Sequence, residues 1–518
     1  MKIQRTRNAG RNIIFGILQK IYQIVIPFIM RTIMIYYMGI TYAGINNLFV
    51  SILQVLNLAE LGIGAAMTYS MYRPIADDDQ ELICALMNLY KKTFRYIGLI
   101  ILVLGVMLLP FIPKLISGSI PEELNIFMLY LMYLGNTVLS YWLFAYKNSL
   151  LYAHQRTDIN SKVILFTNTI QYIVQIYVLI VLKNYYLYIT TTIFTQILTN
   201  ILTAKIVDNM YPQYKPKGNV DENTLSEIKK KTKGLITNKI GSTITLSADS
   251  IVISSFLGLS VLAIYQNYFY IISSIIAFIY ILYQSCLAGI GNSLVMEKAE
   301  KNFDDFNTMT FIVVWIVTIC SSSFLCLFQP FMKIWMGDEL LLSYPIVICF
   351  VIYFYAFEIE QLIGTYKDAA GIWYEDRFRP LITALINLAM NIILVQYIGL
   401  YGVILSTVFS LIIVGIPWIT YNLFKYVFKG ENPMKYLIKL VKYALTSTIV
   451  IFIPVFICMQ IENLGIVTLV IKLIICIVMT NVLYFIVYFK SKEFNKMIQV
   501  LRRLIKNILN SKVESKRE

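Results

Sequence analysis

The sequence predicts an all-α polytopic membrane protein with about 14 transmembrane helices. Hydrophobic residues fill 58% of the 518 positions, and the mean hydropathy is +0.69. Only 14% of the residues are charged, against about one quarter in soluble domains. Apolar runs of about 20 residues, long enough to cross a hydrocarbon core of about 30 Å, recur from end to end. A transmembrane barrel would instead show ~10-residue alternating segments.

The apolar runs place the spans along the chain. The first run is too long for the apolar core of a signal peptide and carries Lys20 and Arg31, so we expect it to be a retained span. The fourteen predicted spans are residues 12–37, 44–70, 96–116, 124–146, 163–182, 185–207, 234–257, 263–290, 311–332, 342–366, 380–397, 400–424, 443–460 and 464–489.

The distribution of Lys and Arg predicts the orientation. Of the 44 basic residues, 37 belong with the N-terminus and the even-numbered connections, and three belong with the odd-numbered ones, namely Lys114, Lys183 and Lys333. Cytoplasmic loops carry such an excess of basic residues. Both termini are therefore predicted to be cytoplasmic. The net charge of +15 is explained by these loops, and no nucleic-acid partner is expected.

An internal repeat divides the chain. Gly39 matches Gly258 at an offset of 219 residues, and Lys20 matches Lys239 at the same offset. At an offset of 220, Ala43, Asn47, Phe49 and Lys147 match Ala263, Asn267, Phe269 and Lys367. Six spans per repeat is an even number, so both repeats enter the membrane in one orientation, as a parallel pseudo-twofold repeat.

The repeat predicts two six-helix lobes and two accessory helices. Repeats of this kind are typical of alternating-access transporters, with the substrate expected between the lobes. The predicted segments are an N-lobe (1–207), a basic cytoplasmic linker (208–233), a C-lobe (234–430), two accessory spans (431–490) and a basic amphipathic cytoplasmic tail (491–518).

Ionisable residues inside spans are the candidate site residues, because such groups are costly in a membrane and tend to face a cavity or a partner. Arg31, Lys20 and Lys239 are predicted to bind an anionic substrate group; snorkelling to the interface is the alternative for Lys20 and Lys239. An Arg31–Asp249 pair is geometrically reasonable. The predicted coupling or cavity acids are Asp249, Glu60, Glu358 and Glu360.

A charged stretch, KDAAGIWYEDRFRP (367–380), interrupts the apolar chain. The charge distribution places it on the cytoplasmic side, and the repeat pairs it with KNSLLYAHQRTDIN in the first lobe. We expect ion pairs here that break when an inner gate opens. The predicted gate residues are Arg156, Glu375, Asp376, Arg377 and Arg379.

Several motifs are missing from the sequence. There is no P-loop motif, no nucleophile elbow and no Cys/His metal motif, and His154 is the single histidine. None of the seven cysteines forms a C-x-x-C pair, so we expect small core residues rather than ligands. No cofactor, no metal and no enzymatic activity are predicted. The tail 492–509 has an i, i+3/i+4 apolar stripe typical of an interfacial helix.

Four stretches carry a resemblance to a known family. They are residues 31–79, 247–271, 367–382 (KDAAGIWYEDRFRPLI) and 399–412 (GLYGVILSTVFSLI). With them the chain resembles the Wzx-like polysaccharide-unit flippases of the multidrug/oligosaccharidyl-lipid/polysaccharide (MOP) exporter superfamily. The resemblance implies twelve core spans, two accessory spans and a bacterial cytoplasmic membrane location. It also implies outward movement of an undecaprenyl-diphosphate-linked oligosaccharide for surface polysaccharide biosynthesis.

The resemblance further implies membrane lipids, a polysaccharide polymerase and glycosyltransferases as partners, and cationic cavity residues that meet the diphosphate. H⁺, Na⁺ or the membrane potential remain open as the driving force. A multidrug or cation antiporter of the same superfamily is the alternative function, in which the acidic residues would dominate the site. A membrane glycosyltransferase or polymerase is disfavoured, because such enzymes need large outer loops with catalytic groups.

Overall fold

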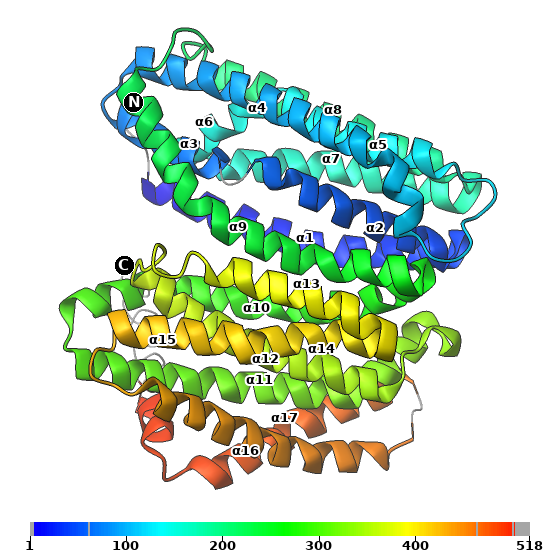
Figure 1. Cartoon of the computed structure of the whole chain (residues 1–518), viewed down its shortest axis with the longest axis vertical. Coiled ribbons are helices and arrows are strands. Elements are labelled where there is room, and N and C mark those ends of the chain that lie inside the picture. Colours follow the sequence, from blue (N-terminus) through cyan, green and yellow to red (C-terminus); the bar gives the residue numbers. More distant parts are fainter. Residues whose placement is uncertain (1–4, 61–62, 463–464, 500–501, 503–518) are drawn as a thin grey trace, which may run out of the picture. The chain divides into compact units, whose positions relative to one another are not determined.

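The protein is all-helical over the part of the chain that its computed structural model describes, residues 5–60, 63–462, 465–499 and 502. Figure 1 shows the helices in chain order. The chain forms two compact units. Unit 1 comprises Met1–Gln266 and Pro380–Gly399, and unit 2 comprises Asn267–Arg379 and Leu400–Glu518.

Unit 1 holds the first eight α-helices, all of α9 and nearly all of α13. Within it α5 packs against both α4 and α8, and α1 packs against α7. Its elements are α1 (Arg5–Met38), α2 (Ile40–Leu56), η1 (Asn57–Ala59), α3 (Ile63–Ala76), α4 (Gln80–Leu108), η2 (Leu109–Leu115), α5 (Ile126–Trp142), α6 (Tyr146–Ala153), α7 (Thr157–Tyr177), η3 (Val178–Leu182), α8 (Tyr185–Met210), α9 (Glu222–Leu257) and α13 (Arg379–Ile398).

Unit 2 is built around α11, which packs against α12, α16 and α17 (Figure 1). Helix α10 begins in unit 1 and continues into unit 2. The elements are α10 (Leu259–Met296), α11 (Ala299–Met336), η4 (Asp338–Leu340), α12 (Tyr344–Ala369), α14 (Leu400–Ser410), η5 (Leu411–Gly415), α15 (Ile416–Tyr426), α16 (Pro433–Met459) and α17 (Ile466–Tyr488).

Several helices begin where the sequence supplies a capping side chain. Asp79 accepts a hydrogen bond from the backbone nitrogen of Leu82 at the start of α4. Asn125, Asn184 and Asp221 cap α5, α8 and α9 in the same way. These side chains satisfy backbone donors that the first helical turn leaves without an intrahelical acceptor. The acidic run ADDDQE therefore serves as a helix start, as its composition predicts.

Eleven described helical segments are long and apolar enough to cross a membrane, or up to twelve if the bent α5–α6 pair counts as one span. The predicted class of a polytopic all-α membrane protein is confirmed, whereas the count of 14 is not. Helix α8 is one predicted span that falls outside this set. Its many threonines lower its hydropathy, although several of them bond to the carbonyl four residues earlier.

The backbone preserves the internal repeat. Gly39, between α1 and α2, has φ 102° and ψ 163°, and Gly258, between α9 and α10, has φ 93° and ψ 169°. A positive φ of this kind favours glycine, because a Cβ would be strained there. Helices α4 and α11 start at Gln80 and Ala299, the same 219 residues apart. The turns and helix order of residues 5–210 thus recur in residues 222–426.

Two spans in the first repeat are broken, where their counterparts in the second repeat are continuous. The predicted span 44–70 is split into α2, η1 and α3, whereas α10 runs unbroken for 38 residues. The predicted span 124–146 ends at Trp142, and α6 follows at an angle of 52°. Phe144 at this bend has a φ of 59°, a left-handed conformation that is uncommon for a bulky residue.

Candidate functional site

The acidic side chain of Asp249 lies in a polar group formed by three helices of unit 1. Asn391 on α13 donates a hydrogen bond of 2.7 Å to one oxygen of Asp249, and the Tyr265 hydroxyl on α10 lies 3.3 Å from the other. Asn387 lies one turn before Asn391, and the two amides are 3.4 Å apart. Asp249 is half-buried. The group offers carboxylate and amide oxygens, which hard cations prefer as ligands.

The predicted cationic residues lie in the same unit. Arg31 is half-buried on α1, one turn after Pro27, and the helix continues through this proline. Lys20 lies three turns earlier and its side chain is exposed. Lys239 belongs to α9, but its side chain lies outside the described part of the structure.

Glu60 lies at the break between η1 and α3. The Tyr141 hydroxyl donates a hydrogen bond of 3.1 Å to its carboxylate and lies 3.4 Å from the side-chain oxygen of Asn57. Tyr141 is the penultimate residue of α5, next to the bend that begins α6. The two breaks of unit 1 therefore meet at one half-buried carboxylate. Broken helices in membrane proteins are tolerated where their backbone lines a cavity or is buried in protein.

Glu358 and Glu360 on α12 have different surroundings, as their spacing of two residues predicts. Glu358 is fully buried, and the Tyr283 hydroxyl of α10 donates a hydrogen bond of 2.8 Å to its carboxylate. Glu360 forms an ion pair with Arg379. The partners of both acids, Tyr283 and Arg379, belong to unit 2, so each bond contributes to the packing of that unit.

The charged stretch 367–380 forms an ion network within unit 2. Arg379 donates from Nε to both oxygens of Asp376 at 2.9 Å, and it also pairs with Glu360. Lys367 lies 3.8 Å from Asp376, and Asn422 of α15 donates to Asp376 at 3.0 Å. Asp376 is completely buried and Arg379 is 7% exposed. A buried carboxylate with this many donors is held in one place.

Arg377 and Glu375 lie on the outside of that network. The Arg377 guanidinium stacks on the Tyr374 ring at 3.6 Å and donates to the Tyr374 carbonyl oxygen. Glu375 is exposed, and its carbonyl oxygen lies 3.5 Å from the Asn422 amide. Among the predicted gate residues of the stretch 367–380, Asp376 and Arg379 thus pair with each other while buried.

Arg156 forms its described ion pair within unit 1. It donates to Asp158 at 2.9 Å, and this hydrogen bond raises the pKa of Arg156. Asp158 is fully buried at the start of α7, and its backbone nitrogen donates to the side-chain oxygen of Asn12. The first repeat therefore has its own buried acid–arginine pair at the position of the second repeat's charged stretch.

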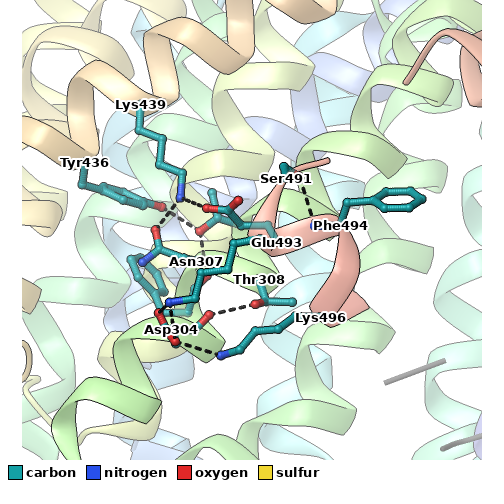
Figure 2. Close-up of polar contacts among 12 residues, drawn as sticks. Asp304, Asn307, Thr308, Tyr436, Lys439, Ser491, Glu493, Phe494 and Lys496 are labelled. Atoms are coloured by element: carbon teal, nitrogen blue, oxygen red, sulfur yellow. Dashed lines mark hydrogen bonds and ion pairs between the residues drawn. The ribbon is translucent and has the colours of Figure 1, made fainter. Parts of the chain in front are cut away.

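A further polar cluster joins the C-terminal segment, residues 491–499, to α11 and α16 (Figure 2). Lys492 and Lys496 pair with Asp304 of α11 at 2.9 and 3.1 Å, and Lys439 of α16 donates to Glu493 at 2.6 Å. Partial burial would raise the pKa of Glu493, but the Lys439 hydrogen bond and nearby positive charges outweigh it and lower that pKa.

The apolar face of the same segment is covered by protein. Phe494 and Met497 are each 6% exposed, and the Phe494 ring lies 5.9 Å from that of Trp315 on α11. Residues 492–499 are helical, as predicted for the tail. In these turns the apolar stripe predicted for an interfacial helix packs on α11 and α17, where Phe494 contacts Trp315 and Phe485. Residues 500–501 and 503–509 of the tail lie outside the described residues.

The comparisons with known proteins identify the fold. No protein-family model and no curated protein sequence matches the chain. Among solved structures, it is similar to a lipid II flippase MurJ in an inward closed conformation, with a TM-score of 0.66 and 17% identity over 92% of this chain and 99% of that one. It is also similar to an inward-facing MATE multidrug resistance transporter of the MOP superfamily. The chain has the MOP fold.

The second likeness has a TM-score of 0.61 at 13% identity, over 82% of this chain and 96% of that transporter. The VcmN MATE transporter of Vibrio cholerae matches with a TM-score of 0.51 at 14% identity, over 81% and 99%. Because the identities are low, these likenesses establish only the fold, which is that of a multi-pass membrane protein. The superfamily predicted from the resemblance is consistent with this fold.

Two features of the site were missed from the sequence. Asn387 and Asn391 were not singled out, although their spacing of four residues on an apolar helix places both amides on one face. Tyr141 was also missed, because one tyrosine among 38 carries no signal. Only the bend after Trp142 brings its hydroxyl to Glu60.

Proposed function

We propose that this protein is a flippase that moves undecaprenyl-diphosphate-linked oligosaccharide units from the inner to the outer leaflet of the bacterial cytoplasmic membrane. It works by alternating access and supplies surface polysaccharide biosynthesis. The observation that carries this proposal is the match of the fold to nearly the full length of a lipid II flippase, in a chain that places Arg31 half-buried within its first span.

In this proposal Arg31 binds the diphosphate, because a guanidinium forms two parallel hydrogen bonds to phosphate oxygens. Lys20 and Lys239 add positive charge along the same pair of repeat-related helices. Asp249 balances Arg31 when no substrate is bound and releases it when the diphosphate arrives. Both termini and the stretch 367–380 face the cytoplasm, where Asp376 and Arg379 hold the inner gate.

In this proposal the acids of unit 1, Asp249 and Glu60, are the residues that couple transport to a driving force. Asp249 has amide and hydroxyl neighbours, and Glu60 has a tyrosine hydroxyl, so either carboxylate can take up H⁺, and the Asp249 group also offers oxygen ligands to Na⁺. The membrane potential acts on any charge that moves, at about 2.3 kcal/mol per charge per 100 mV. Transport assays in proteoliposomes with imposed H⁺, Na⁺ or potential gradients separate these three.

Deletion of the gene tests the substrate class. In a strain without paralogues, the deletion should trap the lipid-linked repeat unit on the cytoplasmic leaflet and remove surface polysaccharide. Neighbouring genes for glycosyltransferases and a polymerase would name the partners. Normal surface polysaccharide in the deletion strain would contradict the proposal.

Arg31→Ala should abolish export while the protein still inserts, and Arg31→Lys should restore it only in part, since a lysine lacks the two-pronged geometry. Arg73→Ala is the matched control, because the Arg73 side chain is 93% exposed and pairs with exposed Asp77. Export is measured by leaflet-specific labelling of the lipid-linked glycan. Wild-type export by Arg31→Ala would exclude the diphosphate role.

A multidrug or cation antiporter is the second candidate, favoured by the likeness to MATE transporters and by the carboxylate of Asp249. In that case Asp249→Asn would raise drug susceptibility as much as deletion does, and Arg31→Ala would not. The described helix connections supply no large catalytic loop, the turn at Gly39 being a single residue between helices. An enzymatic polymerase is therefore not proposed.

A further inference from the structure

Three buried cysteines converge between α11, α16 and α17 of unit 2. Cys326, Cys458 and Cys476 are 6%, 2% and 0% exposed. Their three sulfur atoms all lie within 4.8 Å of one another, and the Cys458 and Cys476 sulfurs are 4.0 Å apart. They come from three helices: α16 and α17 follow one another in the chain, whereas α11 lies well before them, so no short spacing motif links the three cysteines.

The sulfur spacing matches a three-coordinate metal. A thiolate–metal bond is about 2.3 Å long, so three sulfurs at the corners of a triangle around one ion are about 4.0 Å apart. The Cys458–Cys476 distance already has this value. A disulfide has a sulfur–sulfur bond of about 2.05 Å, about half the distance found here, so these two cysteines are free thiols.

The ligand set selects the class of ion. Among the described residues, the group that could hold a metal here contains only these three thiols, with no histidine and no carboxylate. Structural zinc sites take four ligands in a tetrahedron. Soft thiolate ligands suit Cu(I), Zn²⁺ and Fe–S clusters, and of these Cu(I) is the one that three sulfurs alone can hold in a trigonal site. A soft monovalent ion therefore fits this cluster better than Zn²⁺.

A buried cation accompanies the cluster. Lys472 precedes Cys476 by four residues on α17, so both side chains project from the same face, and Lys472 is only 4% exposed. The net negative charge of a thiolate–Cu(I) centre would be favoured by a lysine on the same face of the helix.

Weak contacts with backbone carbonyl oxygens hold the three thiols in place. Each sulfur lies near a carbonyl oxygen of a neighbouring helix: Cys476 is 3.7 Å from that of Ser322, Cys326 is 3.9 Å from that of Pro454, and Cys458 is 3.9 Å from that of Lys472. These are weak S–H contacts. Binding an ion would replace the three thiol protons, which leave to solvent, and would not require the helices to rearrange.

We propose that Cys326, Cys458 and Cys476 bind one Cu(I) ion in a trigonal thiolate site that fastens the accessory helices α16 and α17 to α11. The ion is structural: it joins the accessory helices to unit 2 and takes no part in moving the substrate. The site belongs to unit 2, whereas Arg31, Asp249 and Glu60 belong to unit 1.

The test is a titration of the purified full-length protein with Cu(I) against a colorimetric Cu(I) chelator, without oxygen and with a reductant. The expected result is one tightly bound ion per chain. Each of Cys326→Ser, Cys458→Ser and Cys476→Ser should weaken binding by more than the 10–100-fold typical of losing an outer-shell group. Cys84→Ser and Cys349→Ser are the controls, since both are buried cysteines outside the cluster, and should bind as the wild type does.

A second measurement keeps the result independent of folding. Cu(I) should raise the unfolding temperature of the wild type and of both controls, and should leave that of Cys476→Ser unchanged. Lys472→Met, which keeps all three ligands, should retain one ion with about 10-fold weaker binding, in the range of an outer-shell change. The proposal would be overturned if wild type and Cys476→Ser bound Cu(I) equally well, or if the site preferred Zn²⁺ over Cu(I). A Cys458–Cys476 disulfide in the freshly purified protein would also overturn it.

Discussion

The two repeats share their helix order and turns but place their polar groups differently. In residues 5–210 two spans are broken, and the breaks meet at the half-buried Glu60, which receives one tyrosine hydroxyl. In residues 222–426 the corresponding helices are continuous, and Glu358 receives a tyrosine hydroxyl while fully buried. The same helix order can therefore place a carboxylate at a helix break, as with Glu60, or inside a continuous and buried helix, as with Glu358.

The largest expected effect is on the buried network of the second repeat. Arg379→Ala would leave Asp376 and Glu360 buried without their main cation, so it should destabilise the protein by about 3–5 kcal/mol. Arg377→Ala, on the same loop, should cost less than about 1 kcal/mol, because Arg377 stacks on a half-solvated ring. Thermal unfolding of both variants in detergent measures this; equal shifts would show that the network carries no special stability.

The next effect concerns the turns that the two repeats share. A Cβ at Gly44 would overlap the backbone of Leu259, in the turn that follows Gly258. Gly44→Ala should therefore force helices apart and cost about 1–3 kcal/mol. Gly135→Ala is the control, since a Cβ there meets nothing within 4 Å. The same unfolding assay compares the two, and a neutral Gly44→Ala would mean that the close approach is not required.

The comparison of the two carboxylates is sharpened by removing each tyrosine hydroxyl. Tyr283→Phe leaves the buried Glu358 without its donor and should cost about 1–3 kcal/mol. Tyr141→Phe should cost less than about 1 kcal/mol, because the half-buried Glu60 can bind water. Tyr141→Phe should alter transport more than Tyr283→Phe does, because Glu60 lies where the two helix breaks meet. A larger loss of stability from Tyr141→Phe would reverse the proposed difference between the helix break and the buried helix.

The smallest effect is a pH dependence confined to the first repeat. Burial lowers the pKa of His154, whose ring stacks on Tyr211 at 4.3 Å. Below the ordinary histidine pKa of about 6.5, the unfolded chain then binds more protons than the folded one. Stability should therefore fall as the pH drops below about 6.5, by at most about 1.4 kcal/mol per pH unit.

His154 is the single histidine of the chain, so His154→Gln should flatten the stability profile between pH 5 and 6.5. Unfolding temperatures measured across this range for wild type and variant give the comparison. A profile that keeps its slope in His154→Gln would assign the pH dependence to carboxylates elsewhere in the protein.

Much of the fold could be predicted from local patterns. Apolar run length predicted most of the spans, and the match of Gly39 with Gly258 indicated two related turns, which share one backbone conformation. The breaks in α2–α3 and α5–α6 were not predicted, because the apolar runs continue through them. The count of 14 spans is not confirmed either, because α8 falls outside the set of helices that are apolar enough to cross a membrane.

The candidate site was predictable only in part. Charges inside apolar runs stand out, so Arg31, Asp249, Glu60, Glu358 and Glu360 could be named from the sequence. Their partners could not, because Asn391 lies 142 residues from Asp249 and Tyr141 lies 81 residues from Glu60. Asp376 and Arg379 were named as gate residues, but only the structure shows that they pair with each other, at a spacing of three residues.

By itself the sequence determined the class of the protein, because a chain this apolar must place its helices in a membrane. The distribution of basic residues and the internal repeat are also visible in the sequence alone. The tertiary structure alone decided which polar groups meet. It turned three cysteines from separate apolar runs into one cluster, because helix packing brings together side chains that no periodicity or spacing connects.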